Sequence, residues 1–122
     1  MSLEEAKATL EPLLVAYDAG VERMNKDQNS DSAAVRQRAA AAQAKNVDKL
    51  ARVLAGRDWP PQIQSDVAAI LNYLNQIYPA LEQASTTEDY DECVNLVTRY
   101  ILNGAAKAVT SFRSLELKLG ME

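Results

Sequence analysis

Apolar side chains recur along the chain at spacings of three, four and seven residues, which predicts helices throughout. The strict alternation of apolar and polar residues that marks strands is missing from the sequence. We expect a single domain over residues 1–122, with helices over about 3–27, 33–55, 60–84 and 87–119. Because the connections between these segments are short, the predicted fold is an all-α, antiparallel, up-and-down four-helix bundle.

The first predicted helix has one apolar face and a proline within it. Leu10, Leu14 and Tyr17 share that face. Pro12 removes one backbone hydrogen bond in the middle of the pattern, which predicts that residues 3–11 are angled or frayed.

A polar stretch separates the first two helices. Residues 25–32 predict a turn, and either Asp31 or Ser32 can accept hydrogen bonds from the free N–H groups of the next helix. The first half of that second helix is rich in alanine, which favours helix formation and allows a neighbouring helix to approach closely. Gly56 predicts its end.

Prolines punctuate the third helix. Pro60 and Pro61 suit the first turn of a new helix, where a missing N–H group costs nothing. Pro79 predicts a kink near residues 75–79, at which the helices can splay and open a cavity. The third and fourth helices carry broad apolar faces, so we expect them to supply most of the core.

The fourth helix has a predicted start and a weak point. Ser85 and Glu88 have the spacing of a capping box, which predicts a helix start there. Asn103 and Gly104 interrupt the pattern, but the apolar positions continue on both sides. We therefore expect one continuous helix that tolerates the glycine at a cost of about 1 kcal/mol.

Composition narrows the possible chemistry. The chain has 122 residues, no histidine and one cysteine. The usual zinc, haem and histidine-dependent nucleophile sites therefore lack their ligands and bases, and an internal disulfide is ruled out. No acid, base and nucleophile converge in the pattern, so we expect no enzyme activity, no catalytic residues, no metal and no cofactor.

The charge pattern bears on partners. The net charge of −4 argues against a nucleic-acid partner, and no apolar run approaches the ~20 residues of a membrane span. The second helix carries a basic excess, which we interpret as a solvated face in preference to a dock for an anionic partner. The polar face of the third helix is mostly uncharged, which is compatible with self-association or a partner surface. On the second helix, the basic residues that share one flank are Arg38, Lys45, Lys49 and Arg52.

Two further features have ordinary structural explanations. The acidic cluster Glu88, Asp89, Asp91 and Glu92 falls in the first turn of a predicted helix, where carboxylates complement the helix dipole, and it lacks the spacing of a calcium loop. Cys93 is expected to be a small buried apolar side chain.

Three residues are candidates for contact with a partner or ligand. Trp59 either plugs one end of the bundle, the interpretation that we favour, or forms an aromatic platform beside Arg57. Tyr73, at the margin of the predicted core, is the third candidate.

The segment from Leu50 to Ser85 resembles a hairpin of small secreted or lipid-anchored helical proteins of actinobacteria. The likeness consists of a helix, a turn that ends in Pro60-Pro61, and a second helix with Gln64 and Asp66 near its start. The resemblance implies a location at the cell envelope more than an activity. The acidic first residues do not resemble a targeting segment, so we expect the envelope only if an export signal was removed, and otherwise the cytoplasm.

These observations lead to two hypotheses of function. We expect a non-enzymatic helical module that binds a protein partner or a small ligand, at the cell envelope. The alternative is a cytoplasmic assembly or adaptor domain that forms homo-oligomers through the third or fourth helix. A cavity favours the first hypothesis, and a contiguous exposed apolar stripe favours the second.

Overall fold

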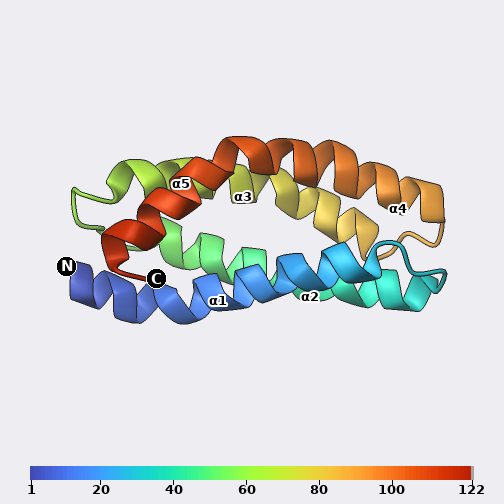
Figure 1. Ribbon diagram of the computed structural model, residues 1–122, viewed down its shortest axis with the longest axis horizontal. Coiled ribbons are helices and arrows are strands. Elements are labelled where there is room, and N and C mark those ends of the chain that lie inside the picture. Colours follow the sequence, from blue (N-terminus) through green and yellow to red (C-terminus); the bar gives the residue numbers. More distant parts are fainter. Residues whose placement is uncertain (122) are drawn as a thin grey trace.

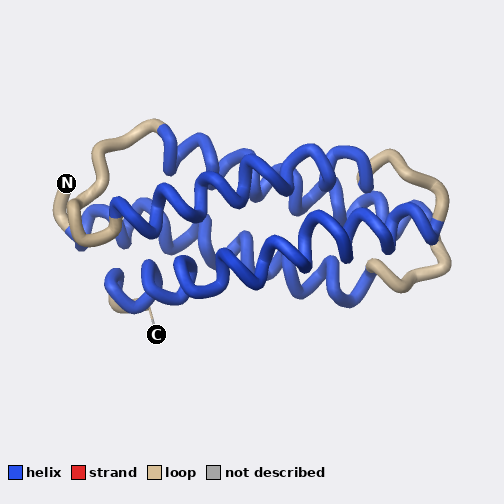
Figure 2. Tube along the Cα trace, turned by 90° about the horizontal axis from the view of Figure 1, so that it is seen from above, coloured by secondary structure: helices blue, strands red, loops and turns tan. Residues whose placement is uncertain are grey.

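The protein is an antiparallel up-and-down bundle of four helical rods, as predicted (Figure 1). The computed structural model describes the backbone of residues 1–121 and the side chains of residues 1–99, 105 and 108–121. All three connections between rods lie at the two ends of the bundle (Figure 2). The rods are α1 (Leu3–Asp27), α2 (Ala33–Ala55), α3 (Gln64–Ala84), and a fourth built from α4 (Tyr90–Leu96), the π-helical segment η1 (Val97–Leu102) and α5 (Asn103–Leu119).

The helix α1 is continuous through its proline. Ser2 and Glu5 close a capping box that the sequence analysis missed, with the Ser2 hydroxyl accepting from the Glu5 N–H group. Ala6 and Leu10 are fully buried, so the start of the helix is held by tertiary packing. The expectation that residues 3–11 fray around Pro12 is therefore wrong, because burial of this face outweighs one lost hydrogen bond.

The helix α2 has the expected bounds. Of the two predicted caps, Ser32 is the one used, and its side chain accepts from the Val35 N–H group. Gly56 forms the cap at the other end.

The helix α3 begins later than predicted. Residues 60–63 form a separate turn, closed by a hydrogen bond of 3.0 Å from the Ile63 N–H group to the Pro60 carbonyl. Trp59 and Ile63 are both buried at this end of the bundle, and anchoring them turns the chain before the helix starts. The helix then continues through Pro79 to its end.

The fourth rod also begins later than predicted. Asp89 is its cap and accepts from the N–H groups of Asp91 and Glu92. Ser85 instead ends α3, where its hydroxyl donates to the Glu82 carbonyl. The predicted capping box of Ser85 with Glu88 is therefore wrong.

The fourth rod is helical without a break from Tyr90 to Leu119, as expected across Asn103 and Gly104. It is not uniformly α-helical, since η1 winds the chain into wider turns just before these two residues. Such π-helical insertions occur often at functional sites.

The core draws on more of the chain than predicted. Nine of the ten largest fully buried side chains among the described residues belong to α1, α2, α3 and the turn before α3, and one belongs to α5. The alanine-rich helix α2 thus supplies core as well as close approach. These ten side chains are Leu10, Leu14, Val47, Leu50, Ile63, Ile70, Leu74, Ile77, Leu81 and Leu115.

Buried polar side chains fix the first two helices together. The Gln43 amide of α2 donates to the Tyr17 carbonyl of α1 at 3.1 Å, and the Asn46 amide donates to the Ala16 carbonyl at 3.1 Å. Gly20 leaves the space for the Gln43 side chain, because a Cβ atom there would lie 1.6 Å from its Oε1 atom. These contacts fix the position of α1, which forms one wall of the candidate site.

Candidate functional site

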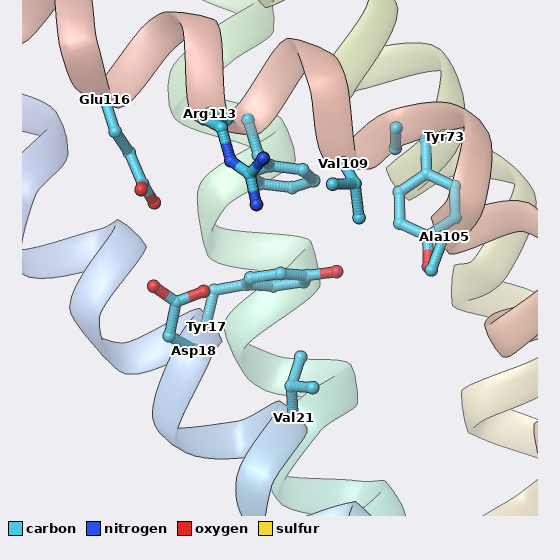
Figure 3. Close-up of a pocket in the computed structure, with 10 residues that line it drawn as sticks. Tyr17, Asp18, Val21, Tyr73, Ala105, Val109, Arg113 and Glu116 are labelled. Carbon is cyan, nitrogen blue, oxygen red and sulfur yellow. The ribbon is translucent and has the colours of Figure 1, made fainter.

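A groove opens on the side of the bundle between α1 and α5. These two rods meet only over a short stretch, whereas α1 packs along α2, α2 along α3 and α3 along α5. The groove has a volume of about 270 Å³. Its lining residues come from three helices: Tyr17, Asp18 and Val21 of α1, Tyr73 of α3, and Ala105, Ala108, Val109, Phe112, Arg113 and Glu116 of α5 (Figure 3).

Three aromatic rings form the apolar surface of the groove. The rings of Tyr17 and Phe112 are stacked, with centroids 4.9 Å apart and an angle of 11° between their planes. Tyr73 meets Phe112 edge to face, with centroids 6.4 Å apart. Both geometries are favourable for aromatic pairs, so the rings hold one another in place.

The two tyrosine hydroxyl groups stay protonated. Burial raises the pKa of Tyr17, and the charge and hydrogen bonding of Tyr73 raise it further. Burial likewise raises the pKa of Tyr73. Both hydroxyls are therefore neutral hydrogen-bonding groups, not bases, near neutral pH.

Charged side chains stand at the rim of the groove. Asp18 and Glu116 point toward one another from α1 and α5, and Arg113 points into the same opening (Figure 3). Desolvation, then the nearby Glu22, raises the pKa of the Asp18 carboxyl. Desolvation, then Asp18, raises the pKa of Glu116, and Arg113 opposes this rise. The two carboxylates thus repel each other across the seam.

The groove continues into the bundle. An inner cavity of about 50 Å³ shares Tyr17, Val21, Tyr73 and Ala105 with the groove. Its other lining residues are mostly apolar, and Val97 places the π-helical segment η1 beside it. The additional inner residues are Met24, Asn25, Gln43, Ile77, Leu81 and Val97.

A polar bridge fixes α5, the second wall of the groove, to α3. The Asp66 carboxylate is largely buried and accepts from the Ser114 hydroxyl at 2.9 Å and from the Lys118 ammonium at 3.0 Å. The two walls of the groove therefore belong to different pairs of closely packed helices, α5 with α3 and α1 with α2. The seam between them is the part of the bundle left open.

The structure does not bring the three predicted contact residues together. Tyr73 is buried and lines the groove. Trp59 is buried in the α2–α3 connection, where its Nε1–H group donates to the Leu54 carbonyl at 2.8 Å, as a plug of the bundle end would. Arg57 is exposed in the same connection. Neither Arg57 nor Trp59 lines the groove.

Most of the groove residues were missed from the sequence. The apolar periodicity assigns Tyr17 and Phe112 to helix faces that point into the core, and it singles out no charged residue of the rim. Pro79, expected near a cavity, is exposed and does not line the groove.

Other candidate chemistry is accounted for by the fold. In the described part of the chain, no group of three or more acidic or cysteine side chains is placed to hold a metal ion. Cys93 is buried, as expected. Across the same residues, no helix combines the length and the apolar character that a membrane span requires.

The fold and the site together define an all-α bundle with an aromatic, acid-rimmed side groove. Comparisons with protein-family models, with curated proteins and with solved structures give no match to this chain.

Proposed function

We propose that this protein is a non-enzymatic binding module that holds a small amphipathic molecule in the groove between α1 and α5. The observation that carries the proposal is the groove itself, with about 270 Å³ of space against three packed aromatic rings and charged groups confined to the rim. Ligand sites in proteins have this composition, an apolar surface with a few polar groups that fix orientation, and the modest volume favours a small ligand.

The chemistry of the lining supports binding more than catalysis. The Tyr17 and Tyr73 hydroxyl groups remain neutral and donate or accept hydrogen bonds. The surrounding Val21, Ala105 and Ala108 offer only apolar contact. A ligand therefore gains burial and orientation here.

The alternative hypothesis, a homo-oligomerising domain, has less support. The exposed large apolar side chains of the described residues are spread over the N-terminus, α1, α4 and α5, and only two of them share a helix. A dimer interface needs a contiguous apolar patch. These exposed residues are Met1, Val15, Tyr90, Val109 and Leu117.

The location at the cell envelope stays a prediction from the sequence.

A groove-filling variant tests the proposal. Ala105 lines both the groove and the inner cavity, so Ala105→Phe places a ring where the ligand would lie. Ala69→Phe makes the same change at an exposed position of α3 and is the control. In a ligand-observed NMR screen of small amphipathic compounds, we expect hits with the wild type and Ala69→Phe that Ala105→Phe loses. A screen without hits, or hits that survive Ala105→Phe, contradicts the proposal.

A further inference from the structure

The rim of the groove carries an excess of negative charge. Asp18 and Glu116 face each other there, and Glu22 adds to the negative potential at Asp18. Arg113 is the single cationic side chain that lines the groove among the described residues. The sum of these four charges is negative, so the opening attracts a cation.

The two facing carboxylates have no cationic partner at ion-pair distance within the described chain. The ion pairs found there join Arg23 to Asp27, Arg52 to Asp48 and Lys118 to Asp66, and none involves Asp18 or Glu116. Arg113 opposes the rise in the pKa of Glu116 without approaching its carboxylate within 4.0 Å. A positive group placed between Asp18 and Glu116 would relieve their repulsion.

The aromatic rings favour the same kind of ligand. Cations are attracted to the faces of aromatic rings at distances of up to about 6 Å from the ring centre, and more strongly when water is excluded. Tyr17 lies beside Asp18 (Figure 3), and Phe112, which stacks on Tyr17, lines the same groove. An organic ammonium group there would contact both carboxylate oxygens and ring carbons.

The inner cavity is suited to the rest of such a molecule. Beyond Tyr17 and Tyr73 its lining is mostly apolar, with Met24 and Leu81 among the side chains that a hydrocarbon body would contact. The groove lining offers only the two carboxylates of Asp18 and Glu116, and in the described chain no group of three or more acidic side chains is placed to hold a metal ion, which favours an organic ammonium group over a divalent metal ion.

We infer that the ligand is a monovalent organic ammonium ion with an aromatic or alkyl body, an inference that rests on the proposed function. The ammonium group lies between Asp18 and Glu116, and the body lies along the rings of Tyr17 and Phe112 toward the inner cavity.

Four probes of nearly the same shape test the charge of the ligand. They are 2-phenylethylamine, 2-phenylethanol, phenylacetate and phenylalanine, which are cationic, neutral, anionic and zwitterionic at neutral pH. We expect the intact protein to bind 2-phenylethylamine most tightly in NMR titrations. Asp18→Asn and Glu116→Gln should each weaken its binding by about two- to fivefold, the range of partly exposed ion pairs. Arg113→Gln should strengthen it, and the exposed control Asp31→Asn should leave it unchanged.

Each other pattern overturns the inference in a recognisable way. If phenylacetate binds most tightly and Arg113→Gln weakens its binding, the groove is an anion site. If all four probes bind with equal affinity, the groove does not distinguish ligands by charge. Tightest binding of phenylalanine, weakened by all three charge variants, shows a zwitterion site. If Ala105→Phe abolishes the binding, each of these patterns remains compatible with the proposed function and overturns only the inference on ligand charge. Failure of all four probes to bind overturns the inference alone if the compound screen gives hits that Ala105→Phe loses. Binding of the probes that Ala105→Phe leaves unchanged contradicts the proposed function as well.

Discussion

Tyr17 of α1 stacks on Phe112 of α5, with ring centroids 4.9 Å apart and only 11° between the ring planes. This pair joins α1 and α5, which pack together less extensively than the other neighbouring rods, and it also lines the groove. The stability of the seam and the shape of the groove therefore depend on the same contact.

Replacing the phenyl ring tests this dual role. Phe112→Leu keeps an apolar side chain of similar size but removes stacking on Tyr17 and the edge contact with Tyr73. We expect a loss of about 0.5–1.5 kcal/mol in the free energy of unfolding, measured by urea denaturation. Val109→Ala, at an exposed neighbouring position, should cost less. Equal losses in the two variants would show that the stacking contributes nothing of its own.

The Gly20 position makes a prediction opposite to helix propensity. Alanine normally stabilises a helix interior by about 1 kcal/mol relative to glycine. Here Gly20→Ala should instead destabilise the protein by about 1–3 kcal/mol, because its Cβ atom would overlap the Gln43 side chain. In a double-mutant cycle, Gln43→Ala should remove most of that penalty. A stabilised Gly20→Ala variant would contradict the close approach of α1 and α2.

Arg36 joins two connections at one end of the bundle. Its guanidinium group donates to the Ser30 carbonyl and, at 3.0 Å, to the Glu88 carbonyl, and it lies 5.1 Å from the centre of the Tyr90 ring. Arg36→Met should lower the free energy of unfolding by about 2–4 kcal/mol, since two partly buried charge-assisted hydrogen bonds are lost. Arg38→Met, an exposed arginine on the same helix, should change it by less than about 0.5 kcal/mol.

The rim carboxylates predict a pH dependence of stability. Because desolvation and Asp18 raise the pKa of Glu116 in the folded protein, the folded state binds a proton more readily than the unfolded chain. The contribution of Glu116 to stability therefore falls as the pH rises from its unfolded-state pKa of 4.5 through its raised folded-state pKa. Glu116→Gln imitates the protonated form and should have a higher Tm than the wild type at pH 7. The difference should vanish below pH 4.5, whereas a difference that persists there would have another cause.

The pH dependence of binding has the opposite direction. Protonation of Asp18 and Glu116 removes the charge that attracts an ammonium ion, while 2-phenylethylamine stays charged in acid. The other titratable groups that surround these two carboxylates are Glu22, Arg113 and the Tyr17 hydroxyl. The affinity of the protein for 2-phenylethylamine should therefore fall as the pH is lowered through the raised pKa values of the Asp18 and Glu116 carboxyls. An affinity that rises in acid would contradict the proposed placement of the ammonium group.

The sequence was sufficient to predict the bundle and most helix ends, because apolar periodicity and the caps at Ser32 and Gly56 are local signals. The errors arose where two local signals compete. Ser85 and Asp89 are both good caps, and only the end of α3 decides that Asp89 starts the next helix. The start of α3 depends on the burial of Trp59, which is a tertiary effect.

The site was harder to predict for a related reason. Periodicity assigns Tyr17 and Phe112 to apolar faces but does not tell which pair of helices packs least closely. Asp18 and Glu116 are ordinary helix-surface residues until α1 and α5 bring them together. Arg36 likewise resembled part of a solvated basic helix and is in fact buried.

A map of backbone amide shifts during titration with 2-phenylethylamine tests the central claim most directly. We predict that the shifts concentrate on α1 around residues 17–21, on α3 around Tyr73 and on α5 between residues 105 and 116. Shifts centred on Arg57 and Trp59 in the α2–α3 connection, or no saturable shifts at all, would contradict the assignment of the groove as the binding site.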